Sequence, residues 1–413
     1  MCGLVPPKQV SRGVVNPASF NAAEDVLATA WYPGWLADVY PPEKISWTKF
    51  NAMTFAFGLT TNDVSKVDLA GAEQALQTFV TQAKNNSVPA LLSIGGWTGS
   101  QYFSTAVATE ANRTAFVQTI LGLVSTYNLD GIDFDWEYPN KQGLGCNTIS
   151  PSDSANFLLF LQALRATPVG SNITLSAAVG LAPFNGPDEQ PMSDVSGFAK
   201  VLDYIAIMAY DIWGSFSTGG VGPNAPLDDS CAPSKQGSAT AAVKAWTAAK
   251  FPPHQIALGV AAYGHSFHVD TSSAKDSSGN LIPYPPFNKA QQPLGDGETT
   301  SNTQEMDKCG VVSGPGGVFS FWSLINNKFL NADGTPASGI DYRFDNCGQT
   351  PYVYNPTSQV MVSFDDPKSF AAKGQFIDTQ GLRGFAMWHA AGDADDLLID
   401  SISDAMGIEQ VCS

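Results

Sequence analysis

The sequence predicts an α/β protein, a (β/α)8 barrel with a small α+β subdomain inserted between the seventh and eighth strands. Short apolar runs alternate with amphipathic stretches along most of the 413 residues. Such runs are typical of parallel strands that are buried on both faces. Eight of them occur, which fits a closed barrel, and one connection is long enough to hold a subdomain.

The predicted strands come first, in chain order. Their lengths suit buried strands, and they cover residues 26–31, 53–57, 90–94, 131–136, 173–179, 204–210, 256–263 and 384–388. Amphipathic segments between them predict helices over residues 69–83, 110–127, 154–166 and 240–250. An open doubly wound sheet is the alternative. It would need a glycine-rich phosphate loop early in the chain, which the sequence lacks.

The connection before the last strand differs from the others. It spans roughly 100 residues, 264–365, and is rich in Pro, Gly and aromatic residues. A structureless loop of this length is improbable in a compact domain, and strand-like pieces occur at 318–324 and 360–364. We therefore predict a barrel over residues 25–264 and 366–408 and a subdomain over residues 265–365. The subdomain is expected to form one wall of a substrate groove.

Composition excludes several function classes. Lys and Arg number 21 against 38 Asp and Glu, which gives a formal net charge of −17. A surface this acidic repels phosphate backbones. The sequence contains no run of 18 apolar residues, which is about the length that a membrane-spanning helix needs. We expect neither nucleic-acid nor membrane partners, and we expect a monomer.

The cysteine pattern favours disulfides over a metal site. The six cysteines form no CxxC pair and the four histidines lack zinc-ligand spacing, so we expect neither metal nor cofactor. An even cysteine count and three glycosylation sequons, at Asn85, Asn112 and Asn172, favour secretion. The chain opens on Met1-Cys2-Gly3 without a charged start and apolar core, so we expect a signal peptide to have been removed.

The disulfide pairing is predicted from where the cysteines fall. One pair follows the fourth and sixth strands, on loops at the same end of the barrel. A second pair lies within the insertion, and a third lies at the chain ends. The expected bonds are Cys146–Cys231, Cys309–Cys347 and Cys2–Cys412.

The chemistry is concentrated at the fourth predicted strand. Side chains alternate along a strand, so Asp133, Asp135 and Glu137 point the same way, into the barrel. Like charges this close cannot all ionise, so at least one pKa should be raised, which creates a proton donor at mild pH. A calcium site is the alternative, but calcium ligands usually come from loops rather than a strand flanked by Trp136 and Tyr138.

The same residues carry a family resemblance. The run 130–137 resembles the DxxDxDxE signature of family 18 chitinases at all four acidic positions. Ser93-Ile94-Gly95-Gly96-Trp97 resembles the family's SxGG element, and Met208-Ala209-Tyr210-Asp211 resembles its MxYD element. Trp388 stands where the family keeps a tryptophan, and the resemblance spans about residues 25–405.

The resemblance implies hydrolysis that is assisted by the substrate, with retention and no second protein nucleophile. Glu137 would protonate the glycosidic oxygen while the sugar's acetamido oxygen attacks the anomeric carbon. Asp135 would orient the acetamido group and Asp133 would share its proton. Tyr210 would donate to the acetamido oxygen, and Asp211 would bind the sugar. Asp130 is out of phase with the other acids, so a supporting role at the strand is expected.

Sugar rings stack on aromatic side chains, so a saccharide groove needs them at the barrel mouth. By resemblance Trp388 would form the floor beneath the sugar at the cleavage site. The other expected substrate contacts lie at strand ends or within the quoted motifs: Trp31, Trp35, Phe57, Gly96, Trp97, Tyr138, Met208 and Tyr263. The stretch from Tyr263 to Phe267 resembles the family's YGRSF-like segment, with His265 in place of the commoner Arg.

We therefore predict a secreted chitinase whose partners are chitin and chito-oligosaccharides. A non-catalytic chitin-binding lectin uses the same barrel, but family lectins typically lose the glutamate that this chain keeps as Glu137. An endo-β-N-acetylglucosaminidase is a further alternative, although those enzymes usually lack the insertion. A two-carboxylate glycosidase would need a second acid on another strand, and nothing in the sequence selects one.

Overall fold

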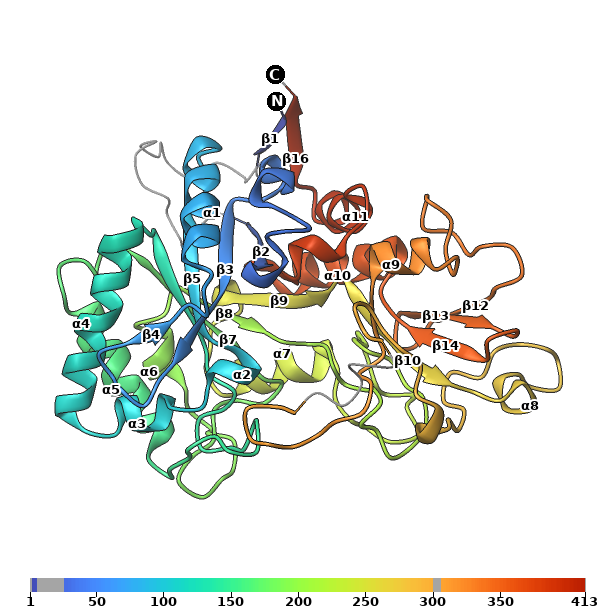
Figure 1. The fold of residues 1–413 in the computed structure, drawn as a ribbon, viewed down its shortest axis with the longest axis horizontal. Helices are drawn as coiled ribbons and strands as arrows, with labels where there is room; N and C mark the ends of the chain where they lie inside the picture. Colours follow the sequence, from blue (N-terminus) through green and yellow to red (C-terminus); the bar gives the residue numbers. More distant parts are fainter. Residues whose placement is uncertain (1, 6–25, 300–305, 413) are drawn as a thin grey trace.

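The computed structural model describes residues 2–5, 26–299 and 306–412, and it contains the predicted closed barrel (Figure 1). Its eight parallel strands pair in the order β2-β3-β5-β6-β7-β8-β9-β15, and β15 pairs again with β2. Each overlaps a predicted strand. Their bounds are β2 Leu27–Pro33, β3 Ala52–Thr60, β5 Ala90–Gly95, β6 Gly131–Asp135, β7 Thr174–Val179, β8 Tyr204–Ile207, β9 Ile256–Ala261 and β15 Gly384–Trp388.

Helices surround the barrel, and the main ones are α1 Glu73–Asn85, α4 Glu110–Tyr127, α5 Asp153–Arg165, α7 Ala239–Ala248, α10 Pro367–Gln380 and α11 Leu397–Ala405. The segment predicted to be helical over 69–83 begins as helix only at Glu73. The chain before it forms the short strand β4 (Val67–Asp68), and Asp68 then accepts a hydrogen bond from the Ala70 N–H in a turn.

Shorter elements complete the barrel. They are α2 Gly96–Gly99, α3 Phe103–Val107 and α6 Ser196–Ala199, with 3-10 turns at Gly34–Leu36, Pro42–Lys44, Trp47–Lys49, Pro253–Gln255 and Ala390–Gly392. The first βα connection therefore consists of 3-10 turns instead of an α-helix. Inside the barrel, buried alanines from five strands line the wall, which leaves room for larger polar side chains at one end.

The insertion is a five-stranded antiparallel sheet in the order β11-β10-β14-β13-β12, with β12, β13 and β14 at the right of Figure 1. Its elements are β10 Tyr263–His268, α8 Thr271–Ala274, a 3-10 turn Lys289–Gln291, β11 Val318–Ser320, α9 Phe321–Asn326, β12 Asp341–Asp345, β13 Thr350–Asn355 and β14 Val360–Ser363. The predicted strand 256–263 therefore covers the whole of one strand and the first residue of the next. The barrel strand β9 ends at Ala261, and β10 turns into the inserted sheet at Tyr263.

Two disulfides join the insertion to the barrel, and both differ from the predicted pairing. Cys146 bonds Cys309, and Cys231 bonds Cys347. The predicted pairs Cys146–Cys231 and Cys309–Cys347 are therefore wrong. The insertion folds back against the loops that follow β6 and β8, so each of its cysteines meets a barrel loop.

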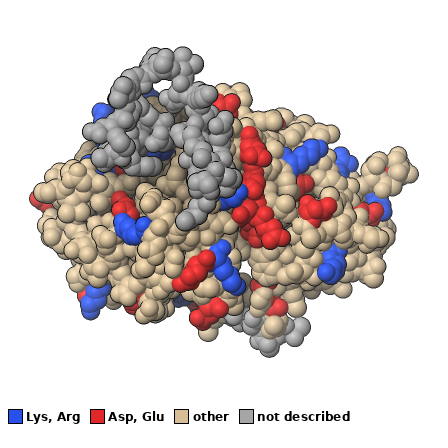
Figure 2. All heavy atoms as spheres, turned by 90° about the horizontal axis from the view of Figure 1, so that it is seen from above, with Lys and Arg blue, Asp and Glu red and all other residues tan. Residues whose placement is uncertain are grey.

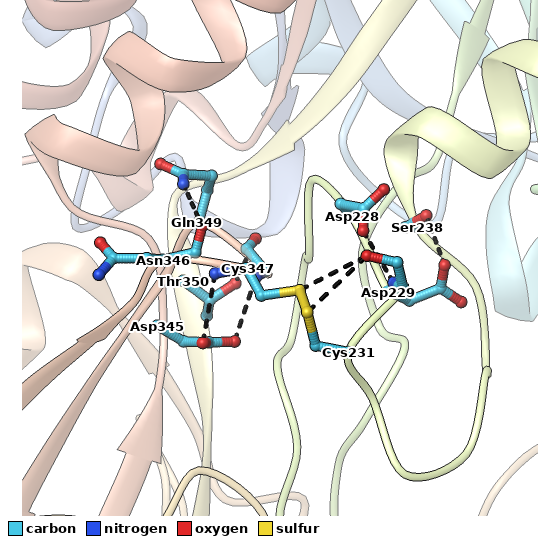
Figure 3. Close-up of a disulfide and its surroundings, with 11 residues drawn as sticks. Asp228, Asp229, Cys231, Ser238, Asp345, Asn346, Cys347, Gln349 and Thr350 are labelled. Atoms are coloured by element: carbon cyan, nitrogen blue, oxygen red, sulfur yellow. Dashed lines mark hydrogen bonds between the residues drawn. A yellow bond between two sulfur atoms is a disulfide. The ribbon is translucent and has the colours of Figure 1, made fainter.

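Figure 3 shows how the second bridge ties the β8–α7 loop to the turn between β12 and β13. The backbone joins at the same place, because the Leu227 N–H donates to the Gly348 carbonyl over 2.8 Å. At the chain ends, β1 (Cys2–Val5) and β16 (Glu409–Cys412) run antiparallel, and their register sets Cys2 opposite Cys412. The side chains of this predicted third bond lie outside the described residues.

The surface charge agrees with the acidic composition. Figure 2 shows acidic side chains gathered in a stripe on the face seen from above, whereas the Lys and Arg side chains there are scattered. Among the described residues, no helix is long and apolar enough to cross a membrane.

Candidate active site

Three acids lie in line where β6 ends inside the barrel. Asp133 and Asp135 lie on β6, Glu137 follows two residues later, and each is at most 8% exposed. The strand registers set Ser93 of β5 and Ser176 of β7 on either side of Asp133. The predicted alternation therefore holds, and it delivers three carboxyl groups to one buried face.

Asp133 is the anchored member of this line. Its carboxylate accepts hydrogen bonds from the hydroxyls of Ser93 and Ser176, each over 2.7 Å, and from the Trp31 indole N–H over 3.1 Å. Burial raises the pKa of Asp133, while these three donors lower it by stabilising the anion. The donors also set its orientation, because a carboxylate that accepts from three sides cannot turn freely.

The other two acids have raised pKa values. Burial raises the pKa of Asp135 well above its ordinary value, and the charges of Glu137 and Asp133 add to the effect. Burial raises the pKa of Glu137 to about 7, opposed by a hydrogen bond from Tyr138 and helped by the charge of Asp211. Glu137 is therefore substantially protonated at mildly acidic pH, as a general acid must be. One buried oxygen of Asp135, Oδ1, has no partner within the described residues.

The backbone around Glu137 is held by residues that the sequence did not indicate. The Ser100 hydroxyl donates to the Asp135 carbonyl over 3.0 Å and accepts from the Glu137 N–H over 3.0 Å. Asn147 donates to the Glu137 carbonyl over 3.0 Å. Gly95 has φ +113°, and a Cβ there would lie 2.1 Å from the Asp135 carbonyl oxygen. A larger residue at Gly95 would therefore displace the catalytic strand.

The acids open into a groove of about 990 Å³ at the C-terminal ends of the strands. Trp388 stacks on Phe57, with ring centroids 5.6 Å apart, and Trp31 lies 6.1 Å from Trp388 at a tilt. Trp35 and Trp97 are 61% and 51% exposed. Large aromatic faces that stay in water are unusual on a soluble surface and suit the C–H faces of sugar rings.

Most of the predicted site residues line this groove: Trp31, Trp35, Phe57, Trp97, Asp135, Glu137, Tyr138, Met208, Tyr210, Asp211 and Trp388. Three predicted residues do not line it. Asp133 lies beneath the other acids. Gly96 is buried against Phe57, whose ring would lie 2.9 Å from a Cβ at that position. Tyr263 lies behind Asp211 and donates to it over 2.7 Å.

Several lining residues were missed. They include Lys141, Gln236 and residues 180–185, which follow β7. The last segment could have been found by asking which residues follow each predicted strand, since those positions form the C-terminal face of a barrel. None of the described residues in 265–365 lines this groove, so the part of the insertion that the structure describes gives the expected groove wall no support.

Tyr210 and Asp211 follow β8 and complete the site. Burial raises the pKa of the Tyr210 hydroxyl well above its ordinary value, so it remains a proton-bearing donor. Asp130, expected to support the strand, does so: it pairs with Lys84 at 2.5 Å and accepts from the Ala90 N–H over 2.8 Å.

These features define a class of protein: a closed (β/α)8 barrel whose buried acids open into an aromatic groove. The profile described as "Glycosyl hydrolases family 18" matches residues 32–393. The chain therefore belongs to glycoside hydrolase family 18.

Individual relatives agree with this assignment. A "chitinase-like effector" of Moniliophthora roreri is 48% identical, over 95% of each chain. One of Moniliophthora perniciosa is 46% identical, over 94% of this chain and 89% of that one. The solved chitinase RmChi1 of Rhizomucor miehei superposes with a TM-score of 0.80 at 32% identity, covering 92% of this chain and 99% of that one.

Proposed function

We propose that this chain is a chitinase that hydrolyses β-1,4-linked N-acetylglucosamine, with Glu137 as the proton donor. One observation carries the proposal. Glu137 is 8% exposed, has its pKa raised to about 7, and lies at the base of an aromatic groove beside Asp135. A buried protonated carboxyl group that faces a groove lined by aromatic side chains is an arrangement suited to glycosidic bond cleavage.

The proposed reaction begins with a sugar over Trp388. Glu137 donates its proton to the glycosidic oxygen, and the acetamido oxygen of the bound sugar attacks the anomeric carbon as the bond breaks. Asp135 turns toward the sugar and accepts a hydrogen bond from the acetamido N–H, and its buried Oδ1 has no hydrogen-bond partner among the described residues that would oppose the turn. Tyr210 donates to the acetamido oxygen. Water then opens the cyclised intermediate, and Glu137, now a base, takes its proton.

Asp133 acts through Asp135 in this scheme. Its three donors favour the ionised form, so it can share a proton with Asp135 without itself moving. The remaining groove residues would bind sugars on either side of the cleavage point. Trp97 and Trp35 are the most exposed of these aromatic residues, which supports stacking against distal units.

Binding without hydrolysis is the second candidate. It is favoured by the two relatives named "chitinase-like effector", which share 48% and 46% identity with this chain. A protein of that kind could hold chito-oligosaccharides in the same groove. The intact line of Asp133, Asp135 and Glu137 favours an enzyme, because a lectin has no need of a buried proton donor.

We also propose secretion as a monomer. Two disulfides support an oxidising compartment, since such bonds rarely persist in the cytosol. Acidic surface charge keeps copies of the chain apart.

Product analysis tests the proposed function. The purified chain is incubated with chitin hexasaccharide and with its fully deacetylated counterpart, and products are identified by mass spectrometry while binding is measured by calorimetry. A chitinase should cleave the acetylated substrate and leave the deacetylated one nearly intact, because the nucleophile is the acetamido group. Binding without any product would support the second candidate, and equal cleavage of both would contradict substrate assistance.

A further inference from the structure

The inserted subdomain is bonded to the loop that carries Glu137. Cys309 lies at the tip of a hairpin, residues 306–312, whose two arms meet in an antiparallel bridge between Met306 and Val312. Its disulfide partner, Cys146, lies on the loop that follows β6 and contains Glu137. In Figure 1 the orange segment around residue 310 extends from the inserted sheet toward the loops below α2.

Hydrogen bonds fix the hairpin at its tip and at its root. Asp307 accepts from the Cys309 N–H over 2.8 Å, which holds the turn that presents the sulfur. At the root, the Glu298 carboxylate accepts from the N–H groups of Gly316 and Gly317 over 2.6 and 3.1 Å, just before the chain enters β11. The position of Cys309 is therefore linked to that of the inserted sheet.

Packing attaches the hairpin only weakly. Its apolar side chains Met306, Val311 and Val312 are 68%, 57% and 55% exposed. Side chains that stay in water contribute little burial energy. The disulfide is thus the firm attachment between this hairpin and the barrel, and its removal should free the hairpin without opening the core.

On the barrel side, the bond ends beside a residue that holds Glu137. Asn147 follows Cys146 directly and is 7% exposed, and its Nδ2 donates to the Glu137 carbonyl over 3.0 Å. Gly143 lies against the same carbonyl, because a Cβ there would be 2.1 Å from the oxygen. The loop therefore folds back onto the backbone of Glu137, and a shift of Asn147 would shift the carboxyl group that this backbone carries.

Other contacts keep the loop near its place when the bond is absent. The Thr148 N–H donates to the Gln101 carbonyl over 3.0 Å, and the Gln101 side chain meets Cys146 Sγ at 3.4 Å. Loss of the bond should therefore loosen Asn147 without unfolding the loop.

We propose that the Cys146–Cys309 bond and Asn147 form a positioning tether through which the inserted subdomain holds Glu137 in place for proton transfer. The proposal rests on the proposed hydrolysis at Glu137. Loosening the tether should lower kcat, because the carboxyl group is then less often aligned with the glycosidic oxygen. KM should change little, since the exposed aromatic residues Trp35 and Trp97 lie on other connections.

The test measures kcat and KM on chitin hexasaccharide at one mildly acidic pH, at a temperature well below the lowest Tm of the chains compared. A tether-free chain carries Cys146→Ser and Cys309→Ser, a second carries Asn147→Ala, and a third carries all three changes. The matched control carries Cys231→Ser and Cys347→Ser, which removes the bond between the insertion and the β8–α7 loop.

We expect kcat to fall about tenfold in the tether-free chain and in Asn147→Ala, since a full 1 Å misplacement can cost about a hundredfold. The combined chain should be no slower than Asn147→Ala alone, because coupled residues are not additive. The control should keep its kcat. If the tether-free chain does not fold, dithiothreitol can open the bond in the folded control chain, where kcat should fall about tenfold and recover on reoxidation.

Three results would overturn the proposal and leave the hydrolytic function intact. They are an unchanged kcat without the tether, an equal fall when either disulfide is removed, and losses that multiply in the combined chain. The second result would mean that both bonds act only through general stability, and the third that the bond does not act through Asn147. Absence of hydrolysis by the unsubstituted chain would overturn the proposed function together with the tether.

Discussion

Replacing Ser176 with alanine should move the pH dependence of catalysis without removing any group that touches the substrate. The Ser176 hydroxyl donates to Asp133 over 2.7 Å and is fully buried. A hydrogen bond to a charged group contributes about 1.5–3 kcal/mol. At about 1.4 kcal/mol for each pKa unit, its loss should raise the pKa of Asp133 by roughly one to two units.

The sign follows from the role of the anion. Burial already raises the pKa of Asp133, and the Ser176 donor lowers it. Without that donor, Asp133 becomes protonated at a higher pH and can no longer share the proton of Asp135. The acidic limb of the kcat profile should therefore shift upward by about one to two pH units. The assay is kcat from pH 3 to pH 9 on a chromogenic chito-oligosaccharide.

Ser104→Ala is the matched control for this prediction. Ser104 is also buried and donates over 2.6 Å to a buried carboxylate, Asp153, which lies outside the groove lining. Both variants should lose some thermal stability, but only Ser176→Ala should shift the acidic limb. Equal shifts in the two variants, or no shift in either, would refute the reasoning that the donors around Asp133 tune the site.

Three further changes test the groove and its supports. Trp97→Ala should raise KM for the hexasaccharide about five- to tenfold, since it removes about 1–1.4 kcal/mol of stacking, while Trp322→Ala, an exposed tryptophan outside the groove, should not. Lys373→Met should lower the free energy of unfolding in denaturant by about 3–5 kcal/mol, because it leaves Asp365 buried and unpaired. Replacing Cys146 and Cys309 together with serine should lower Tm, because their bond closes a loop of 163 residues. The free energy of unfolding should fall by about 2–5 kcal/mol. Unchanged unfolding in either stability variant would contradict its assigned role.

The strands and the acidic line were predictable from the sequence for physical reasons. A parallel strand that is buried on both faces is apolar along most of its length, so each barrel strand can be recognised in the sequence as a short apolar run. Alternation then places Asp133, Asp135 and Glu137 on one face regardless of the surrounding loops. The break between β9 and β10 was not readable, because Ala262 continues an apolar run while the chain changes sheets.

Contacts between distant segments were the part that could not be predicted. The disulfide pairing depends on how the insertion folds back onto the barrel loops, and nothing local at Cys309 or Cys347 indicates it. Ser100 supports the backbone around Glu137 from another connection, and an isolated serine carries no signal of that kind. The contact between His265 and Asp211 likewise joins two segments that are 54 positions apart.

Glu137→Gln tests the central claim most directly, through hydrolysis and binding measured on the same preparations. Glutamine keeps the shape of the side chain but has no proton to donate, so kcat on chitin hexasaccharide should fall by about 2–4 orders of magnitude or more. The Kd for the same oligosaccharide should stay within a few fold of the unsubstituted chain. Near-normal turnover in the Glu137→Gln variant would contradict the assignment of Glu137 as the proton donor.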